Sequence, residues 1–346
     1  MKISKGRRVT IKDIAKNTGY SIATVSRVLN DSGMFYSKQT YDKIKKAIEE
    51  LDYHPDGIAR GLKTRKTFNI AFLEPWTSEF FTEIFLGIQD AANENGYSVA
   101  TFISNYKMEQ EERNIRTILS NRLDGVIVPC SVLNKGNIKK LKEQNIPVVT
   151  IEKFLEDKEV PAVSIKNLEV SKKAIGYLIG LGHRAIGFMG EPLEVGKVNA
   201  RFMGYKNALE EAKINFNSEF VFVDEKLREE KYSDSYEFVK KNIDRILKCS
   251  ALFITSDKIA ITVIRVLKET GVLVPEDISV IGFDGLEISK YITPALTTIL
   301  QPKYEMGRVA MEILLKMINN KPRENIELKA ELLISESTSP PRETKV

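Results

Sequence analysis

The sequence is poor in the residues that build disulfides, metal centres and many active sites. It contains two cysteines, two histidines and one tryptophan in 346 residues. Cys130 and Cys249 lie far apart in apolar surroundings, so we expect two reduced thiols rather than a disulfide, and a cytoplasmic location. Neither cysteine stands at a zinc-site spacing from His54 or His183. We therefore expect no metal and no cofactor.

Long apolar runs and the usual enzyme motifs are absent too. No stretch is apolar enough to span a bilayer, and the opening MKISKGRRVT has no hydrophobic segment behind its basic residues. There is no Walker phosphate loop, no G-x-S-x-G elbow and no cluster of metal ligands. These absences argue against a membrane protein, a secreted solute-binding protein and an enzyme.

The charge is unevenly distributed along the chain. Residues 1–66 hold 15 basic and 7 acidic residues, a net charge of +8, whereas the remainder holds 37 and 40, a net charge of −3. A positive field on one segment favours contact with a polyanion through the release of counterions. We expect nucleic-acid binding to be confined to the first 66 residues.

The segment from Val9 to Asn30, VTIKDIAKNTGYSIATVSRVLN, has the pattern of two short helices joined by a tight turn. Thr10 and Asp13 form a capping-box start, so a helix should open at Ile11. Gly19 tolerates a left-handed turn, and Ser21 can cap a second helix that runs through Leu29.

A third helix, expected from Ser37 to Leu51, would complete this small unit. Its apolar residues recur at helical spacing: Tyr41, Ile44, Ile48 and Leu51. Val25, Val28 and Leu29 of the second helix should pack on Ile14 and Ala15 of the first. The pattern predicts a helix-turn-helix with a supporting helix.

The second helix should turn one face outward to DNA. Ile22, Ala23 and Arg27 would meet base edges in a major groove, and the arginine fork matches the acceptors of guanine. Thr24, Ser26 and Asn30 could donate to phosphates. The alternative is an ordinary three-helix unit with no function on its exposed face. The predicted DNA-binding residues of this unit are Thr10, Ser21, Ile22, Ala23, Thr24, Ser26, Arg27 and Asn30.

From residue 69 onward, apolar strands alternate with amphipathic helices. Strands are expected at 69–73, 97–103, 125–129, 147–151, 185–190, 220–223, 251–255 and 279–283, with helices at 80–95, 109–121, 137–144, 200–212, 233–248 and 257–270. Strands that are almost wholly apolar indicate parallel sheets covered on both faces. The predicted fold is α/β: two doubly wound subdomains whose strands end at a shared cleft.

The opening motif closely resembles that of LacI/GalR-family bacterial transcription regulators, above all in the AT-VSRV-N core. The phrases LGHRAIGF, VPEDISVIGFDG and TPALTTILQP extend the resemblance along nearly the whole chain. It implies a periplasmic-binding-protein-like core whose chain crosses between subdomains three times, near Ala162, Ile292 and Asn320. The implied domains are 1–55 for DNA binding, 56–68 for a hinge, 69–161 with 293–320 and 162–292 with 321–335 for the two subdomains, and 336–346 for a polar tail that should fray.

Residues 56–68 form the implied hinge. Asp56 can cap a short helix, but Gly57 and Gly61 each cost about 1 kcal/mol of helix propensity, so a flexible linker is favoured in the free protein. The segment resembles the family's hinge helix, which orders on DNA and wedges a leucine into the minor groove. The residues implied to contact DNA there are Ala59, Leu62, as the wedge, and Lys63.

The resemblance also implies which residues hold a small effector in the cleft. Arg201 and Asp284 match positions that bind the effector in the family, and Asp284 follows a strand at its carboxyl end. Without the resemblance, they would be a solvated helix-opening residue and a turn residue. Further candidates, each of which could instead be a core, wall or capping residue, are Trp76, Phe80, Phe81, Ser256 and Asp257. Val195 replaces a polar contact of some relatives, which leaves the effector's identity open.

We therefore expect a cytoplasmic homodimer that binds a pseudo-palindromic DNA operator, most simply as a repressor of a carbohydrate-utilisation operon with a sugar or sugar derivative as effector. The helix at 80–95 carries more apolar surface than one sheet face can bury, which favours a dimer interface there. Alternatives are a regulator of the same family that responds to a protein partner or to a non-sugar metabolite such as a nucleobase, and, less favoured, a solute-binding protein.

Overall fold

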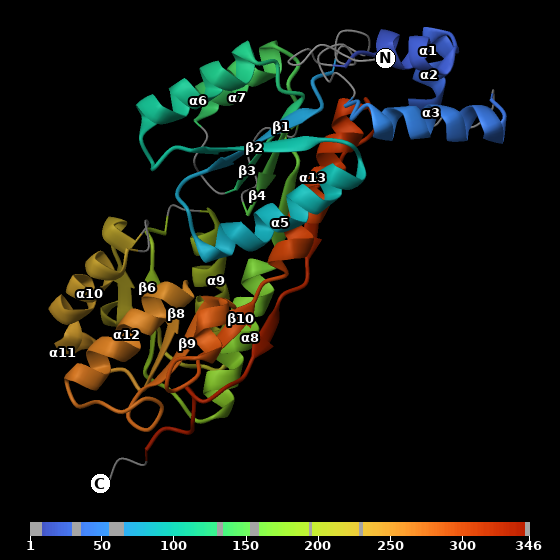
Figure 1. The fold of residues 1–346 in the computed structure, drawn as a ribbon. Helices are drawn as coiled ribbons and strands as arrows, with labels where there is room; N and C mark the ends of the chain where they lie inside the picture. Colours follow the sequence, from blue (N-terminus) through green and yellow to red (C-terminus); the bar gives the residue numbers. More distant parts are fainter. Residues whose placement is uncertain are drawn as a thin grey trace. The chain divides into compact units, whose positions relative to one another are not determined.

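The computed structural model describes residues 9–29, 36–54, 66–129, 134–152, 159–193, 196–227 and 231–342. Contacts between residues divide the chain into two compact units, Met1–Phe68 and Asn69–Val346. Figure 1 shows the chain coloured along its sequence. Cys130, Asn30 and the predicted hinge with Ala59, Leu62 and Lys63 lie outside the described residues.

The first unit contains the three predicted helices, α1 (Ile11–Thr18), α2 (Ile22–Leu29) and α3 (Lys38–Glu50). The turn after α1 is made by Gly19, whose φ of 74° is the left-handed conformation that glycine adopts without strain. The three helices share one apolar core. Its buried residues are Ile14, Ala15, Val25, Val28, Ile44, Ala47 and Tyr53, and Leu29, Ile48 and Leu51 pack against them. The predicted packing of α2 on α1 is confirmed.

The second unit is built on two largely parallel sheets, as predicted. Each has six strands, in the orders β11-β5-β4-β3-β1-β2 and β12-β10-β9-β8-β6-β7, and β5, β10, β11 and β12 were not predicted. All pairings are parallel except β10 with β12. The strands of the first sheet are β1 (Asn69–Glu74), β2 (Ser98–Ile103), β3 (Gly125–Pro129), β4 (Val148–Ile151), β5 (Ala162–Ile165) and β11 (Ile326–Leu328). Those of the second are β6 (Ile186–Gly190), β7 (Val221–Val223), β8 (Ala251–Ile254), β9 (Ser279–Asp284), β10 (Thr297–Leu300) and β12 (Glu331–Leu333).

Helices cover both sheets, because the near-continuous apolar strands must be shielded on each face. Those of the first subdomain are α5 (Glu79–Glu94), α6 (Met108–Ser120), α7 (Lys135–Glu143) and α13 (Lys303–Ile318). Those of the second are α8 (Asn167–Gly180), α9 (Gly196–Glu211), α10 (Tyr232–Lys241), α11 (Ile243–Ile246) and α12 (Asp257–Glu269). Short 3₁₀ turns span Ser218–Phe220, Glu225–Leu227 and Glu287–Lys290.

Helices α5 and α13 lie side by side on the first sheet (Figure 1). Their backbones touch at two glycines: a Cβ on Gly87 would stand 2.0 Å from the carbonyl oxygen of Tyr304, and one on Gly307 would stand 2.0 Å from that of Ile84. Between the sheet and α13, most apolar residues of α5 are buried, among them Phe81 and Ile88, while Leu86 stays exposed. The stripe is therefore no argument for a dimer interface, since α13 from the far end of the chain covers it.

The chain crosses between the subdomains later than predicted. β5 pairs with β4, and β10 pairs with β9, before the chain changes sheet. The return strand β11 pairs with β5, and the chain crosses a third time before β12. Predicted crossings near Ala162, Ile292 and Asn320 are thus too early. The reason is that the short strands β5, β10 and β11, which were not predicted, each extend a sheet before the chain leaves it.

The polar tail is docked, contrary to the expectation that it frays from Glu336. Ser337 is fully buried, and its hydroxyl accepts from the Thr297 backbone N–H at 2.8 Å and donates to the carbonyl of Val280. The Ser339 carbonyl lies 2.8 Å from Nε2 of His183, whose Nδ1 lies 3.0 Å from a serine hydroxyl. The prediction from polar composition is wrong, because these polar residues form hydrogen bonds with buried backbone groups of the second sheet.

Cys249 is a free thiol in the core of the second subdomain. Burial raises the pKa of its thiol to about 12, so the thiolate needed for redox or metal chemistry is scarce at neutral pH. No helix among the described residues has the length and apolarity that crossing a membrane requires.

Ser337→Ala should lower the free energy of unfolding of the core by about 1–3 kcal/mol, because it leaves the buried N–H of Thr297 without an acceptor. Ser120→Ala is the matched control, since that exposed hydroxyl bonds only a carbonyl one turn earlier. The control should change stability by less than about 0.5 kcal/mol. Urea unfolding of both variants measures the difference, and equal losses would contradict a structural role for the tail.

Candidate functional site

The exposed face of α2 is the first candidate surface. Ile22 is 45% exposed, and Ala23 and Arg27 are also exposed, while Val25 and Val28 point into the core. The three outward residues are those predicted to meet base edges. Their spacing along two helical turns presents an apolar patch beside one guanidinium, a combination suited to base edges.

The polar residues of this surface mostly support the helix ends. The Asp13 carboxylate accepts from the backbone N–H and the hydroxyl of Thr10 at 2.9 and 2.7 Å. Ser21 caps α2 by accepting from the Thr24 backbone N–H at 3.1 Å. Thr24 and Ser26 are half-buried. These contacts shape the surface. Phosphate binding by Thr24 and Ser26, and DNA contact by Thr10 and Ser21, stay predictions.

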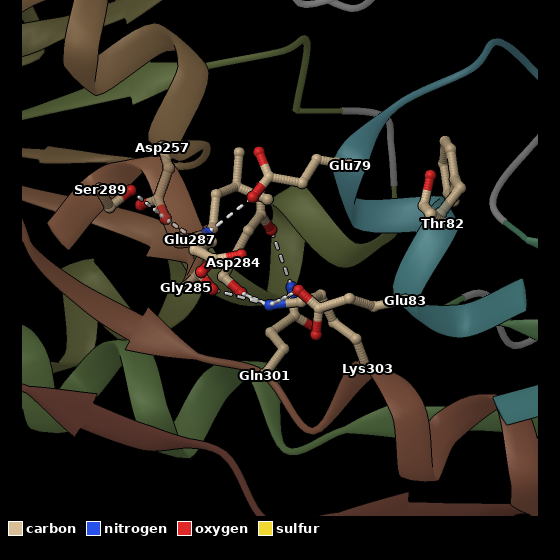
Figure 2. A network of polar contacts seen from close by, with 12 residues as sticks. Glu79, Thr82, Glu83, Asp257, Asp284, Gly285, Glu287, Ser289, Gln301 and Lys303 are labelled. Carbon is tan, nitrogen blue, oxygen red and sulfur yellow. Dashed lines mark hydrogen bonds and ion pairs between the residues drawn. The ribbon is translucent and has the colours of Figure 1, made fainter. Parts of the chain in front are cut away.

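The second candidate site lies where the carboxyl ends of the two sheets face each other. Figure 2 shows polar side chains from α5 of the first subdomain meeting the loop that follows β9 of the second. Residues that end or follow a strand here include Glu74, Glu152, Ser256, Asp284 and Gln301, all of them buried. The concentration of buried polar groups at strand ends is typical of a ligand site in open α/β sheets.

Arg201, on α9, is 1% exposed and is held from several sides. Its Nε donates to Asn167 Oδ1 at 2.8 Å, and one terminal nitrogen donates to the carbonyl of Thr255 at 2.8 Å. The other terminal nitrogen pairs with Glu152 Oε1 at 3.3 Å. The guanidinium carbon lies 3.5 Å from the centre of the Phe283 ring. Because Glu152 follows a strand of the first sheet, this pair joins the two subdomains.

Asp284, the last residue of β9, is 5% exposed and has a φ of 113°, far from the extended conformation of the strand before it. Its Oδ1 accepts from Gln301 Nε2 at 2.9 Å. A non-glycine residue at such a φ is strained, and strain of this kind concentrates at functional sites. The chain therefore turns sharply at Asp284, at the carboxyl end of β9, where a ligand is expected.

Lys303 stabilises this strained turn from inside. Its ammonium is buried and donates to the carbonyls of Asp284 and Gly285, both at 2.8 Å, and it pairs with Glu83 Oε1 at 3.3 Å (Figure 2). One turn earlier on α5, Glu79 Oε1 accepts from the Glu287 backbone N–H at 2.8 Å. The start of α5 is thus connected to the β9 loop by two acidic side chains.

Asp257 supports the same loop from the second subdomain. It is fully buried, and it accepts from the Leu286 backbone N–H at 2.8 Å and from the hydroxyls of Ser289 and Thr298 at 2.9 and 2.6 Å. Burial, together with the charge of nearby Asp284, raises its pKa to about 7. These protein donors give Asp257 a positioning role; contact with an effector stays a prediction for it.

The predicted aromatic residues form one cluster. Phe81 is 1% and Phe80 is 7% exposed, so both are buried. Phe81 packs edge-on against Trp76 with ring centres 5.2 Å apart, and Trp76 lies 5.1 Å from Tyr106. Trp76 thus stands at the boundary between this cluster and the cleft.

A cavity of about 670 Å³ opens beside Trp76 between the subdomains. Its first-subdomain lining is Trp76, Thr77, Asn105, Tyr106 and Lys107, and its second-subdomain lining is Lys231, Tyr232, Ser233 and Lys258. Of these wall residues, Trp76 alone was predicted from the sequence. The sequence prediction also missed Glu74, whose pKa burial raises to about 7, and the connecting residues Glu152, Gln301 and Lys303.

The signal for some of these residues was present in the sequence. Glu74 ends the first predicted core strand, and Glu152 follows the strand PVVTI, just as Asp284 follows SVIGF. No comparable signal marks Lys303, whose role depends on a turn and a helix distant in the chain. Val195 lies outside the described residues. Within the described part of the chain, no group of histidine, cysteine and acidic residues could hold a metal ion.

Known proteins share both halves of this arrangement. Residues 10–56 match "Bacterial regulatory proteins, lacI family", and residues 175–338 match "Periplasmic binding protein-like domain". The HTH-type transcriptional regulator RegA of Clostridium saccharobutylicum is 35% identical over 335 residues, which cover 95% of this chain and 99% of RegA. The chain belongs to the lacI family of bacterial regulatory proteins.

Two further comparisons place this LacI-family chain. The HTH-type transcriptional repressor PurR of Aliivibrio salmonicida is 33% identical over 91% of this chain and 94% of PurR. The structure described as "transcriptional regulator CelR-cellobiose complex" superimposes with a TM-score of 0.73 and 26% identity, over 95% of this chain and all of that one. The protein is a DNA-binding transcription regulator, and these relatives are regulators rather than enzymes.

Lys303→Met should destabilise the core by about 1–3 kcal/mol, since it leaves two buried carbonyls of the strained turn without their donor. Glu83→Gln removes only the half-exposed partner and should cost less than about 1 kcal/mol. Thermal and urea unfolding of the two variants compare these costs. A loss no larger for Lys303→Met than for Glu83→Gln would show that the carbonyl contacts contribute little.

Proposed function

We propose that this LacI-family regulator represses transcription by binding a pseudo-palindromic DNA operator as a homodimer. Each α2 enters a major groove, with Arg27 donating to guanine and Ile22 and Ala23 contacting neighbouring bases. The observation that supports this most directly is the outward face of α2, in a unit whose sequence carries the net charge of +8. Leu62, outside the described residues, wedges the minor groove at the operator centre.

The dimer follows from the twofold symmetry of such an operator. Its contact face does not involve the apolar stripe of α5, which α13 covers. Exposed apolar side chains are available elsewhere on the core: Leu86 is 48% exposed, and Tyr291, after the 3₁₀ turn that follows the β9 loop, is 73% exposed. Tyr291 is close in sequence to the cleft residue Asp284. A dimer contact at Tyr291 would therefore bring the partner subunit near the segment that follows β9.

Arg27→Ala should weaken binding to the preferred operator, selected from a random DNA library with the wild-type protein, by about 1–3 kcal/mol. Binding to random duplex should weaken far less, because the lost contacts are to base edges. Lys46→Ala is the matched control, since this exposed residue lies on α3 and pairs with Glu50. Fluorescence anisotropy at fixed salt measures both affinities. Equal losses on operator and random DNA would contradict base reading by Arg27.

The effector we propose is a small polyhydroxylated molecule, a sugar or sugar derivative, bound between the subdomains. The cleft supplies a guanidinium and several carboxylates, the groups that pair with vicinal hydroxyls. Among the described residues, the buried hydroxyl of Ser256, Oε1 of Gln301 and Nε1 of Trp76 have no hydrogen-bond partner. A buried polar atom without a partner costs free energy, so a ligand that satisfies these atoms is favoured.

A nucleobase is the second candidate effector. It is favoured by the similarity to PurR and by the aromatic wall of Trp76 and Tyr106, whose rings are tilted by 32° and could pack against a planar ring. The sugar is preferred because the deep cleft is richer in carboxylates than in flat apolar surfaces. Both effectors would contact the same residues of the cleft, so the two proposals differ only in the chemistry of the ligand.

Effector binding is coupled to DNA binding through closure of the cleft. The pair of Arg201 with Glu152 and the contacts of α5 with the β9 loop already cross between the subdomains. A ligand that competes with or adds to these contacts shifts the balance between open and closed cleft. The coupling is reciprocal, so operator DNA changes the affinity for effector by the same factor.

Asp284→Asn should weaken effector binding at least tenfold, because it removes the charge from a buried acceptor while keeping the shape and the bond from Gln301. Asp244→Asn, on an exposed surface of the same subdomain, is the control. The effector comes from a thermal-shift screen of sugars, phosphosugars and nucleobases against wild type, and isothermal titration gives the affinities. Unchanged binding by Asp284→Asn would remove this residue from the site.

A further inference from the structure

The mouth of the cleft differs sharply in charge from its floor. Here the floor denotes the buried strand-end carboxylates Glu74, Glu152 and Asp284, and the mouth denotes the cavity of about 670 Å³ lined by Lys107, Lys231 and Lys258. No acidic residue is among the described residues that line the mouth. These lysines come from both subdomains, so only a group held between the subdomains can meet all three. In the described part of the chain, neither Lys107 nor Lys258 pairs with an acidic side chain.

Each of these lysines also stands at the N-terminus of a helix. Lys107 and Lys231 are the N-cap residues of α6 and α10, and Lys258 is in the first turn of α12. A helix N-terminus carries a partial positive charge, so a lysine is unfavourable there and an anion is favourable. Three such placements around one cavity concentrate positive potential that the fold does not require.

The N-termini of α6, α10 and α12 lack the side-chain caps that would otherwise accept hydrogen bonds from their first N–H groups. No side-chain capping hydrogen bond forms at Lys107, Lys231 or Ser256, the N-cap residues of α6, α10 and α12. Ser256 is 1% exposed, and its hydroxyl has no partner within the described structure. Elsewhere in the same chain, Ser37, Ser78 and Asn134 do cap their helices.

The acidic residues of the same helix starts are directed elsewhere. Glu111 of α6 is 5% exposed and accepts from the backbone N–H of Asn134. Asp257 of α12 is engaged with the β9 loop. Glu109 and Asp234, the other first-turn acids, do not line the cavity. Among the described residues, the first-turn acids of these helices therefore do not line the mouth.

Taken with the proposed function, on which this rests, we propose that the effector carries a compact anionic group, a phosphate or a carboxylate, and that Lys107, Lys231 and Lys258 bind it at the cleft mouth. The hydroxylated part of the ligand faces the carboxylates of the floor, and the aromatic walls Trp76 and Tyr232 flank the connection between the two parts. The lysines also make closure of the cleft depend on the ligand. Without an anion, the lysines of the two subdomains repel each other at this edge, and a bound anion attracts both.

The test compares charged and neutral ligands on the full chain at constant ionic strength. The probes are inorganic phosphate and matched pairs: glucose with glucose 6-phosphate, ribose with ribose 5-phosphate, and glucose with glucuronate, which keeps the sugar ring, as the carboxylate arm. The variant is K107Q/K231Q/K258Q, and the charge-matched control is K248Q/K268Q/K321Q on exposed positions of the core. Isothermal titration gives affinities, and thermal shift gives stabilisation by mass action.

Wild type and the control should be stabilised by phosphate and should bind at least one charged sugar about tenfold or more tightly than its neutral parent. The cleft variant should lose the phosphate stabilisation and reduce that ratio to about one. Without ligand, it should melt no lower than wild type, since it removes positive charge from helix N-termini. The phosphate and carboxylate arms identify which anion is preferred.

Two outcomes separate this inference from the proposed sugar effector. If a neutral sugar stabilises wild type and the cleft variant equally, while phosphate and the charged sugars add nothing that depends on the lysines, the anionic subsite is refuted and the sugar proposal stands. If phosphate binds through the three lysines but no sugar in either form binds above that level, the subsite stands and the sugar proposal fails.

Discussion

The ion pair between Arg201 and Glu152 is the interaction on which the core depends, because it is buried and its two members belong to different subdomains. Removing two charges from water costs several kcal/mol for each ion, so such a pair persists only with further hydrogen bonds. Arg201 donates such hydrogen bonds to Asn167 Oδ1 and to the Thr255 carbonyl, and its guanidinium lies on the face of Phe283. The cleft is thus already a preorganised site for polar groups.

The residues around this pair maintain a strained conformation at the end of β9. Asp284 has a φ of 113°, and Gly285 follows with a φ of 65°. Such a turn persists only where surrounding contacts over-determine it. Lys303 holds its carbonyls, and Asp257 holds the next N–H along the loop. Because Lys303 and Glu79 also connect this turn to α5, a ligand that moves the turn acts on the first subdomain directly.

The cleft and the surface of α2 were predictable to different degrees. The residues predicted to face DNA lie on one short helix, where the 3.6-residue period separates Ile22, Ala23 and Arg27 from the core-facing Val25 and Val28. Arg201 and Asp284 were predicted to hold an effector from family resemblance, and Asp284 also from its strand-end position; the structure buries both at the carboxyl edge of the second sheet. Lys303 and Gln301 were missed, because no local pattern marks a residue whose partners are brought close by another strand and helix.

The sequence by itself determined the three helices of the first unit, the run of alternating strands and helices, and the charge difference between the two parts of the chain. Those features depend on local periodicity, capping and composition, which a linear pattern contains. Only the tertiary structure decided where the chain crosses between sheets, that α13 buries the apolar stripe of α5, and that the polar tail docks through Ser337. These depend on pairing between segments distant in sequence, where geometry rather than composition determines which buried groups find partners.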